Sequence, residues 1–290
     1  MTHPAHVWAW LGEGHPLADV EDAVARMSDS RLGLWSRCSF AWFMRYIAGV
    51  KERPSASMAL GRAWDETTTS AMRRQLAGQR SARSEVVGQF EHLLFGEIEE
   101  VELPATWDTS AVLSSGSVLA GLWLDRYVPR IEPLEVQPKL SFAVPANENE
   151  AGRSAFEIVG AADAIARVDG ALVIVDNKTA AKRWGRGDAQ DGTQPAIYAA
   201  GALRLGHTVI GAEYHVAVFG RHPVLQRLTR PVGREEISGV IRRICQAVAQ
   251  IRATAAVGAW MPNRSHFLCS RRWCGYWRTC EHVFGPSVKP

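Results

Sequence analysis

Long hydrophobic runs and an excess of either charge are missing from this 290-residue sequence. No apolar run approaches the roughly 20 residues that a transmembrane helix needs, and Met1-Thr-His-Pro-Ala-His6 lacks the basic start and apolar stretch of a secretory signal peptide. We therefore expect a cytoplasmic protein with no membrane partner. Lys and Arg outnumber Asp and Glu by only 33 to 30, so a nucleic-acid partner can be argued only from local basic segments.

Cysteine is also scarce, with 5 residues in the whole chain. In a reducing compartment these thiols indicate a metal site or core positions and exclude a disulfide framework. Internal repeats and low-complexity tracts are absent, and 47% hydrophobic residues are typical of a globular protein. We predict a single domain over residues 1–290, with a helical region at about 28–130, an α/β core at about 131–256 and a Cys-rich segment at about 257–285.

The periodicity of apolar residues predicts helices, then a small sheet with helices around it. This order indicates an α+β or α/β fold. Helices are expected at 28–47, 60–76, 86–98, 112–127, 194–205 and 235–256, strands at 134–144, 156–167, 171–178, 209–219 and 224–229, and irregular structure at 260–290.

Asp169-Gly170 has the composition of a two-residue hairpin turn between two apolar segments. This turn places Val168 opposite Ala171 and, in the same register, Asp163 opposite Asp176. Like charges on facing positions destabilise a sheet, and a divalent cation such as Mg²⁺ or Mn²⁺ would remove the conflict. The hairpin therefore predicts a metal site.

Lys178 follows Asp176 by two residues and so points to the same face of its strand. An ammonium group beside a metal-bound water suits metal-assisted hydrolysis of a phosphodiester. The alternative is an ordinary Asp–Lys ion pair on a half-exposed hairpin. The apolar character of Val173-Ile-Val175 favours the metal site, because burial makes unpaired carboxylates costly.

Cys269, Cys274 and Cys280 supply three thiolate ligands within twelve residues, which indicates a second metal site. Of the two remaining cysteines, Cys245 lies among apolar residues, which favours a core position. We therefore predict Cys38 as the fourth ligand. Zinc and a [4Fe–4S] cluster both accept four thiolates. The absence of paired Cys-x-x-Cys knuckles favours the cluster. Trp107, Trp123 and Trp260 are predicted to pack in the core rather than to stack on DNA bases.

The order of these motifs resembles that of the PD-(D/E)XK nucleases of the RecB type. Within this family, it resembles the iron–sulfur subset, which includes the AddB helicase-nuclease subunit and the CRISPR-associated and phage exonucleases. The resemblance covers about residues 30–280. It rests on Ser30-Arg-Leu-Gly-Leu-Trp-Ser-Arg-Cys38, Gly61-Arg-Ala-Trp-Asp65, Gly160-Ala-Ala-Asp163, Asp176-Asn-Lys178, Gln194-Pro-Ala-Ile-Tyr198 and the closing cysteines.

The resemblance implies an α/β fold with a restriction-endonuclease-like core, a small mixed sheet flanked by helices. It also implies a metal-dependent DNA exonuclease of recombination, repair or phage DNA processing. It implies DNA as partner, together with a strand-annealing protein or a helicase. The implied roles are Mg²⁺ or Mn²⁺ binding by Asp65, Asp163 and Asp176, catalysis by Asp163, Asp176, Lys178, Gln194 and Tyr198, a [4Fe–4S] staple on Cys38, Cys269, Cys274 and Cys280, and DNA contacts by Lys182, Arg183 and Arg186.

Asp65 departs from the family pattern, which usually has a metal-binding histidine at this position. Ser39 stands where proline often follows the first cysteine, and four residues separate Cys269 from Cys274 where two are common. Two other hypotheses stay open: a DNA-binding subunit with a degenerate nuclease site, and a zinc-stabilised interaction protein.

Overall fold

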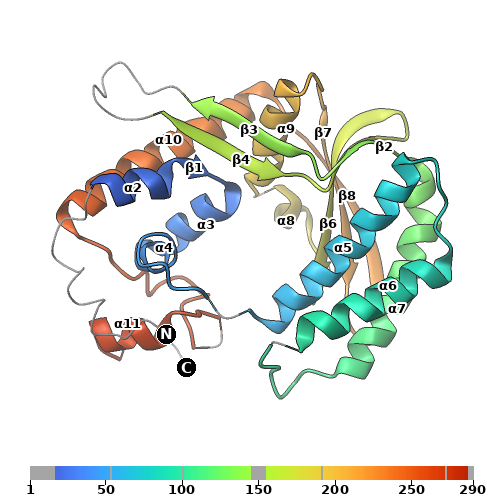
Figure 1. Cartoon of the computed structure of the whole chain (residues 1–290), viewed down its shortest axis with the longest axis horizontal. Coiled ribbons are helices and arrows are strands. Elements are labelled where there is room, and N and C mark those ends of the chain that lie inside the picture. The colour runs from blue at the N-terminus through green and yellow to red at the C-terminus, as the bar shows by residue number, and fades with distance from the viewer. Residues whose placement is uncertain are drawn as a thin grey trace. The chain divides into compact units, whose positions relative to one another are not determined.

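The computed structural model describes residues 17–52, 54–99, 101–144, 155–190, 192–271 and 273–286 (Figure 1). The chain divides into two compact units. Unit 1 comprises Met1–Arg53, Ser141–Val159 and Ser238–Pro290, and unit 2 comprises Pro54–Leu140 and Gly160–Ile237. The single domain predicted over residues 1–290 stays a prediction.

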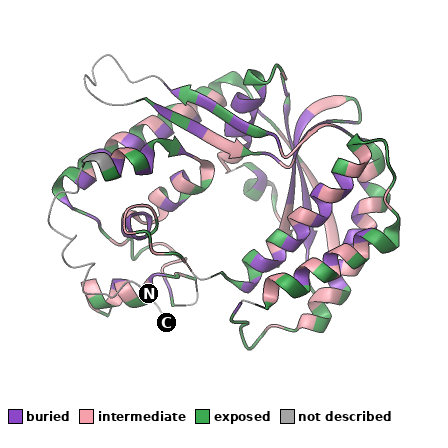
Figure 2. Ribbon diagram, in the orientation of Figure 1, coloured by how far each residue is buried: buried purple, intermediate pink, exposed green. Residues whose placement is uncertain are grey.

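Unit 2 is built on a five-stranded sheet with the order β2-β5-β6-β7-β8. Strands β6 and β7 run parallel, whereas the other neighbouring pairs are antiparallel. The whole of β7 and the middle of β6 are buried (Figure 2), as expected for strands whose two faces are both covered. The strands are β2 (Ile131–Val136), β5 (Ala164–Val168), β6 (Ala171–Ala180), β7 (Gly211–Val218) and β8 (Val224–Pro231).

Three helices cover one face of this sheet: α5 (Ala56–Leu76), α6 (Arg83–Ile98) and α7 (Thr109–Arg126). Their core includes the fully buried Trp64, Phe90 and Trp123, packed against Val175 and Ala217 of the sheet. The short 3-10 helix η1 (Val128–Arg130) follows α7. Helices α8 (Arg186–Gln190) and α9 (Gln194–Arg204) lie in the crossover from β6 to β7, and α9 packs on both strands.

Unit 1 contains a three-stranded sheet with the order β1-β4-β3, in which β1 and β4 are parallel. Its aromatic core stacks the ring of Trp260 on those of Phe43 and Trp42, with centroids 5.2 and 6.0 Å away. The elements that lie wholly or mostly in unit 1 are α2 (Leu17–Val24), β1 (Arg26–Met27), α3 (Asp29–Arg37), α4 (Ser39–Tyr46), β3 (Lys139–Val144), β4 (Phe156–Ala161), α10 (Arg234–Val257) and α11 (Trp277–Phe284).

The predicted α/β architecture of mixed sheets flanked by helices is confirmed, and so is the core position of Trp123 and Trp260. None of the described helices is long and apolar enough to cross a membrane.

Several elements predicted from the sequence differ in the structure. The strand expected at 156–167 divides into β4 and β5, which belong to different sheets. The helix expected at 28–47 breaks at Cys38, because Met261 exchanges hydrogen bonds with Ser39 and accepts one from the N–H of Phe40. The strand expected at 134–144 is interrupted at Gln137, whose φ is 49°. The segment expected to be irregular contains α11.

Candidate active site and cysteine pocket

The β5–β6 hairpin has the predicted register. Asp169 and Gly170 have φ values of 49° and 85°, the positive values that a type I′ turn requires. Val168 pairs with Ala171, and the last pair is Ala164 with Val175. Asp163 and Asp176 therefore lie one step beyond that pair, at the open end of the hairpin. A purely local turn signal thus brings two carboxylates together.

Asp176 and Lys178 form a close ion pair on one face of β6. The Nζ atom of Lys178 lies 2.9 Å from Oδ1 and 2.8 Å from Oδ2 of Asp176. The side chain of Asp176 is only 4% exposed, whereas that of Lys178 is 31% exposed. The Oδ2 atom of Asp163 accepts a 2.6 Å hydrogen bond from the backbone N–H of Asn177. The two carboxylates thus have separate partners.

Burial and the neighbouring charge of Asp176 raise the pKa of Asp163 to about 8. Lys178 and the N–H of Asn177 oppose this shift. Burial alone would lower the pKa of Lys178, but the charges of Asp176 and Asp163 raise it. Without a cation, the pair of carboxylates therefore holds a proton near neutral pH. Such a strongly shifted group is typical of functional sites.

A pH-dependent stability follows for the metal-free protein. Because the folded state holds a proton on Asp163 that the unfolded state releases near pH 3.8, stability should fall as the pH rises towards 8. The contribution of this group is at most about 1.4 kcal/mol per pH unit. Urea unfolding with chelator present should show this slope, and Asp163→Asn should remove it. An unchanged slope in the variant would contradict the assignment.

Asp65 comes to the site from α5, a different element from the hairpin. Its Oδ2 atom accepts a 3.4 Å hydrogen bond from Nε2 of Gln137. Burial, followed by the charge of Glu66, raises the pKa of Asp65, and both Lys178 and Asp176 act on it electrostatically. The predicted third carboxylate is thus a neighbour of the hairpin pair.

The Gly160-x-x-Asp163 and Gln194-x-x-x-Tyr198 motifs are interlocked. A Cβ atom at Gly160 would lie 2.7 Å from Cε1 and 3.1 Å from Cδ1 of Tyr198, so the glycine makes room for the buried ring. Gln194 Nε2 in turn donates a 2.7 Å hydrogen bond to the hydroxyl of Tyr198. The spacing of four residues on α9 places both side chains on one helix face.

Substitution Gly160→Ala should displace the ring of Tyr198 and break its hydrogen bond to Gln194. We expect a loss of about 1–3 kcal/mol from overpacking, measured by urea unfolding. A second substitution, Tyr198→Leu, should recover much of this stability, because it removes the ring that the new methyl group meets. Full stability in the single variant would show that the ring moves freely.

Several residues near the site carry no strong sequence signal. Tyr214 of β7 pairs in register with Asp176, and burial, then the charge of Asp176, raises the pKa of Tyr214. Arg230 of β8 donates a 2.6 Å hydrogen bond to the carbonyl of Gly192, just before α9. Tyr214 depends on the parallel pairing of β6 with β7, and Arg230 contacts a residue 38 positions away in the sequence, so local patterns miss both.

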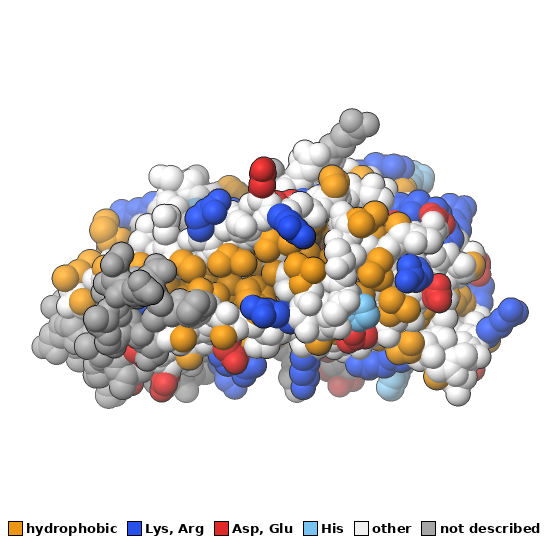
Figure 3. All heavy atoms as spheres, turned by 90° about the horizontal axis from the view of Figure 1, so that it is seen from above, with side chains coloured by type: hydrophobic (Ala, Val, Ile, Leu, Met, Phe, Trp, Pro, Cys, Tyr) orange, Lys and Arg blue, Asp and Glu red, His pale blue; other side chains and the backbone are white. Residues whose placement is uncertain are grey.

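The predicted basic loop follows β6 directly. Lys182 and Arg183 are exposed, while the side chain of Arg186 lies outside the described residues. Gln226 holds the backbone of Trp184 by two hydrogen bonds, accepting from its N–H at 2.9 Å and donating to its carbonyl at 3.2 Å. The loop is therefore fixed on β8 while its cations face solvent. Figure 3 shows one face of the protein, turned by 90° from the view of Figure 1. On that face the Lys and Arg side chains are scattered among apolar side chains and do not form a continuous basic patch.

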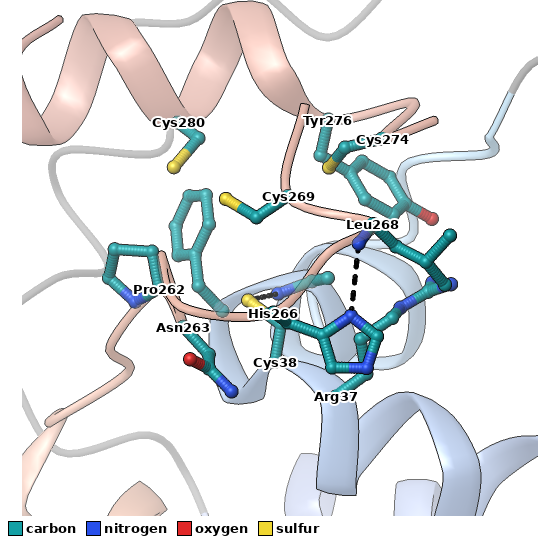
Figure 4. Close-up of a pocket in the computed structure, with 12 residues that line it drawn as sticks. Arg37, Cys38, Pro262, Asn263, His266, Leu268, Cys269, Cys274, Tyr276 and Cys280 are labelled. Atoms are coloured by element: carbon teal, nitrogen blue, oxygen red, sulfur yellow. Dashed lines mark hydrogen bonds between the residues drawn. The ribbon is translucent and has the colours of Figure 1, made fainter. Parts of the chain in front are cut away.

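The four predicted cysteine ligands line one pocket in unit 1 (Figure 4). Cys38 reaches it from the α3–α4 break, where its Sγ accepts a 3.4 Å hydrogen bond from the N–H of Ala41. Cys269, Cys274 and Cys280 come from the C-terminal segment. Burial, with Cys38 and Cys269 close by, raises the pKa of Cys280 to about 12. The fifth cysteine, Cys245, is not among the residues that line the pocket.

Across the described parts of the chain, no three His, Cys, Asp or Glu side chains are arranged so that they could hold a metal ion. Within each predicted site, the carboxylate or cysteine ligands lie near one another, but their side chains do not point to one common position. The donor chemistry nevertheless fits the two expected metals. A divalent cation would offset the repulsion of Asp163 and Asp176, and four thiols around one pocket match the ligand set of zinc or an iron–sulfur cluster.

Comparisons with known proteins bear on the family and the fold. No curated protein sequence matches the chain. Among solved structures, a presumed exonuclease from Eubacterium rectale shares 14% identity at a TM-score of 0.50, covering 84% of this chain and 86% of its own. The structure of SSO0001 shares 13% identity at a TM-score of 0.40, covering 94% and 95%. The sequence profile of the PD-(D/E)XK nuclease superfamily matches residues 26–281. The chain belongs to the PD-(D/E)XK nuclease superfamily.

Proposed function

We propose that this protein is a metal-dependent exonuclease that hydrolyses phosphodiester bonds of DNA. One observation carries the proposal: in a chain of this superfamily, Asp163, Asp176 and Lys178 lie together at the open end of a hairpin. We assign it to DNA recombination, repair or phage DNA processing, by its resemblance to RecB-type exonucleases. A strand-annealing protein or a helicase is the partner that this resemblance implies.

Asp163 and Asp176, with Asp65 beside them, are the residues that would hold Mg²⁺ or Mn²⁺. When bound, the cation would supply a Lewis acid that acidifies water and offsets the charge of the phosphate. Lys178, whose side chain is 31% exposed, would place its ammonium group beside a phosphate oxygen and the attacking water. Gln194 and Tyr198, locked to each other on α9, would position the strand to be cut.

The four cysteines of the pocket are proposed to hold a [4Fe–4S] cluster with a structural role. Cys38 and the C-terminal cysteines are more than two hundred residues apart in sequence and line the same pocket. A shared cluster would therefore fix the α3–α4 break against the C-terminal segment within unit 1. The buried Tyr276, which also lines the pocket, would help to exclude solvent from it.

The basic loop is proposed to contact the DNA backbone through Lys182, Arg183 and Arg186. Replacing Lys182 and Arg183 by alanine should weaken DNA binding equally for all sequences and lower the salt slope of the affinity by about 2. Fluorescence anisotropy at several salt concentrations measures both effects. Arg126→Ala on α7 is the control, because α7 covers the opposite face of the sheet from Asp176. An unchanged salt slope of the affinity in the double variant would show that the loop does not contact DNA.

Degradation of end-labelled DNA tests the proposed activity. Anaerobically purified protein should degrade DNA only when Mg²⁺ or Mn²⁺ is present, on single- or double-stranded substrates labelled at either end. The label that disappears first gives the polarity. Folded protein that binds DNA without cutting it would instead support a degenerate DNA-binding subunit, with Asp65 at the usual histidine position as the leading cause.

A further inference from the structure

Asn177, the middle residue of Asp176-Asn177-Lys178, is a polar residue in an apolar layer. Successive residues of a strand face opposite sides, so its side chain points away from the site, towards α7. It is 6% exposed, and its Nδ2 atom has no hydrogen-bond partner among the described residues. Val175, the preceding residue on this face, belongs to the apolar core. Burying an amide here is costly compared with an aliphatic side chain.

Among the described residues, Trp123 of α7 provides the one hydrogen bond to this amide side chain. Its indole Nε1–H donates to Oδ1 of Asn177 at 3.0 Å, and both residues are buried. This bond fixes Asn177 against a helix whose own position is secured by a large core. The backbone N–H of the same Asn177 donates to Oδ2 of Asp163 at 2.6 Å. A continuous chain of contacts therefore runs from α7 through the sheet to a site carboxylate.

We propose that Trp123 and Asn177 are positioning residues that hold the backbone N–H donor in place and so orient the carboxylate of Asp163 for cation binding. This proposal rests on the proposed function in one respect, namely that the group bound by Asp163 is a cation. Asp163 lies beyond the last pair of the hairpin. Its backbone carbonyl accepts a 2.9 Å hydrogen bond from the N–H of Gln137, but this bond does not orient its side chain. The bond from the N–H of Asn177 is the direct restraint on its side chain, and Trp123 restrains the donor.

The variant that separates positioning from folding is Asn177→Leu combined with Trp123→Phe. Asn177→Leu alone would leave the indole N–H of Trp123 buried without its acceptor, whereas the double variant removes both partners and should keep an unfolding midpoint near that of the wild type. If Asn177 positions Asp163, the same double variant should bind Mn²⁺ about 10-fold more weakly, the lower end of the effect of losing a group that supports a metal ligand. Mn²⁺ affinity would then fall without a matching loss of stability.

Trp123→Phe tests the other partner. It keeps an aromatic ring in the core and deletes the indole N–H, which leaves Oδ1 of Asn177 buried without its donor. We expect lower stability and weaker Mn²⁺ binding. Combined with Asn177→Leu, it should add little further loss of affinity, because the two residues act through one contact. Ser115→Ala is the matched control on the same helix, since it removes a buried 2.9 Å hydrogen bond to the carbonyl of Gly220. It should lower stability and leave Mn²⁺ affinity unchanged.

The experiment measures Mn²⁺ affinity by calorimetry, urea unfolding, and the amide proton shift of Asn177 in metal-free protein with ¹⁵N-labelled asparagine. For Trp123→Phe, that resonance should move upfield as the bond to Asp163 weakens. Unchanged resonance and affinity in this variant, with only stability reduced, would overturn the proposal. Wild-type protein that neither binds Mn²⁺ nor cuts DNA would overturn the proposed function instead, and the amide resonance would still decide whether Trp123 positions the donor to Asp163.

Discussion

Asp176→Asn should abolish metal-dependent DNA cleavage while the protein stays folded. Asparagine keeps the size of the side chain but removes the negative charge that faces Asp163 and pairs with Lys178. Losing a group that merely supports a metal ligand costs about 10–100-fold, so losing a ligand should lower kcat/KM by at least about 100-fold. End-labelled DNA degradation in Mg²⁺ and in Mn²⁺ measures the effect.

The loss must be specific to the site. Asp125→Asn is the control, because Asp125 forms an ion pair with Arg83 on the exposed side of α7, with a side chain 49% exposed. It should cut DNA at the wild-type rate. Unfolding curves of both variants should show a single transition near that of the wild type. Cleavage by Asp176→Asn at more than a tenth of the wild-type rate would show that Asp176 is not a ligand of the proposed cation.

The hairpin is the part of the site that sequence reasoning predicts best. Its register depends on a two-residue turn and on the strict alternation of a strand, and both are local properties. The pair Asp163 and Asp176 follows from them. Tyr214 could not be found in this way, since its place beside Asp176 depends on the parallel pairing of β6 with β7. The crossover between these strands contains two helices, so no short-range signal sets its register.

The buried support of the site shows a second limit. Asn177 occupies the unspecified middle position of the Asp176-x-Lys178 motif, and only its contact with Trp123 gives it a role. The break of the helix at Cys38 likewise depends on hydrogen bonds between Ser39 and Met261, which are far apart in the chain. Helix propensity alone favours a continuous helix there. In both places tertiary contacts decide the local structure, whereas the chemistry of the cysteines and carboxylates is readable from their residue types.

Cys280→Ser should remove the colour of the anaerobically purified protein and weaken unit 1. Wild-type protein with a [4Fe–4S] cluster absorbs near ~400 nm and contains iron, and Cys280 is a buried member of the cysteine pocket. Structural metal sites can contribute about 10–16 kcal/mol to folding, so we expect unit 1 of the variant to unfold or to be cut readily by protease.

Cys245→Ser separates this effect from a general need for thiols, because Cys245 lies on α10 in the same unit and is not part of the pocket lining. It should keep both the iron and the resistance to protease. Colourless wild-type protein with bound zinc would assign the pocket to a four-thiolate zinc site, because zinc has no such absorption. Full iron content and stability in Cys280→Ser would exclude Cys280 as a ligand. The cysteine pocket lies in unit 1, whereas the carboxylates lie in unit 2. Loss of the cluster should therefore leave the Mn²⁺ affinity of any remaining folded unit 2 intact. Calorimetry on the protease-resistant fragment tests whether the two sites are independent.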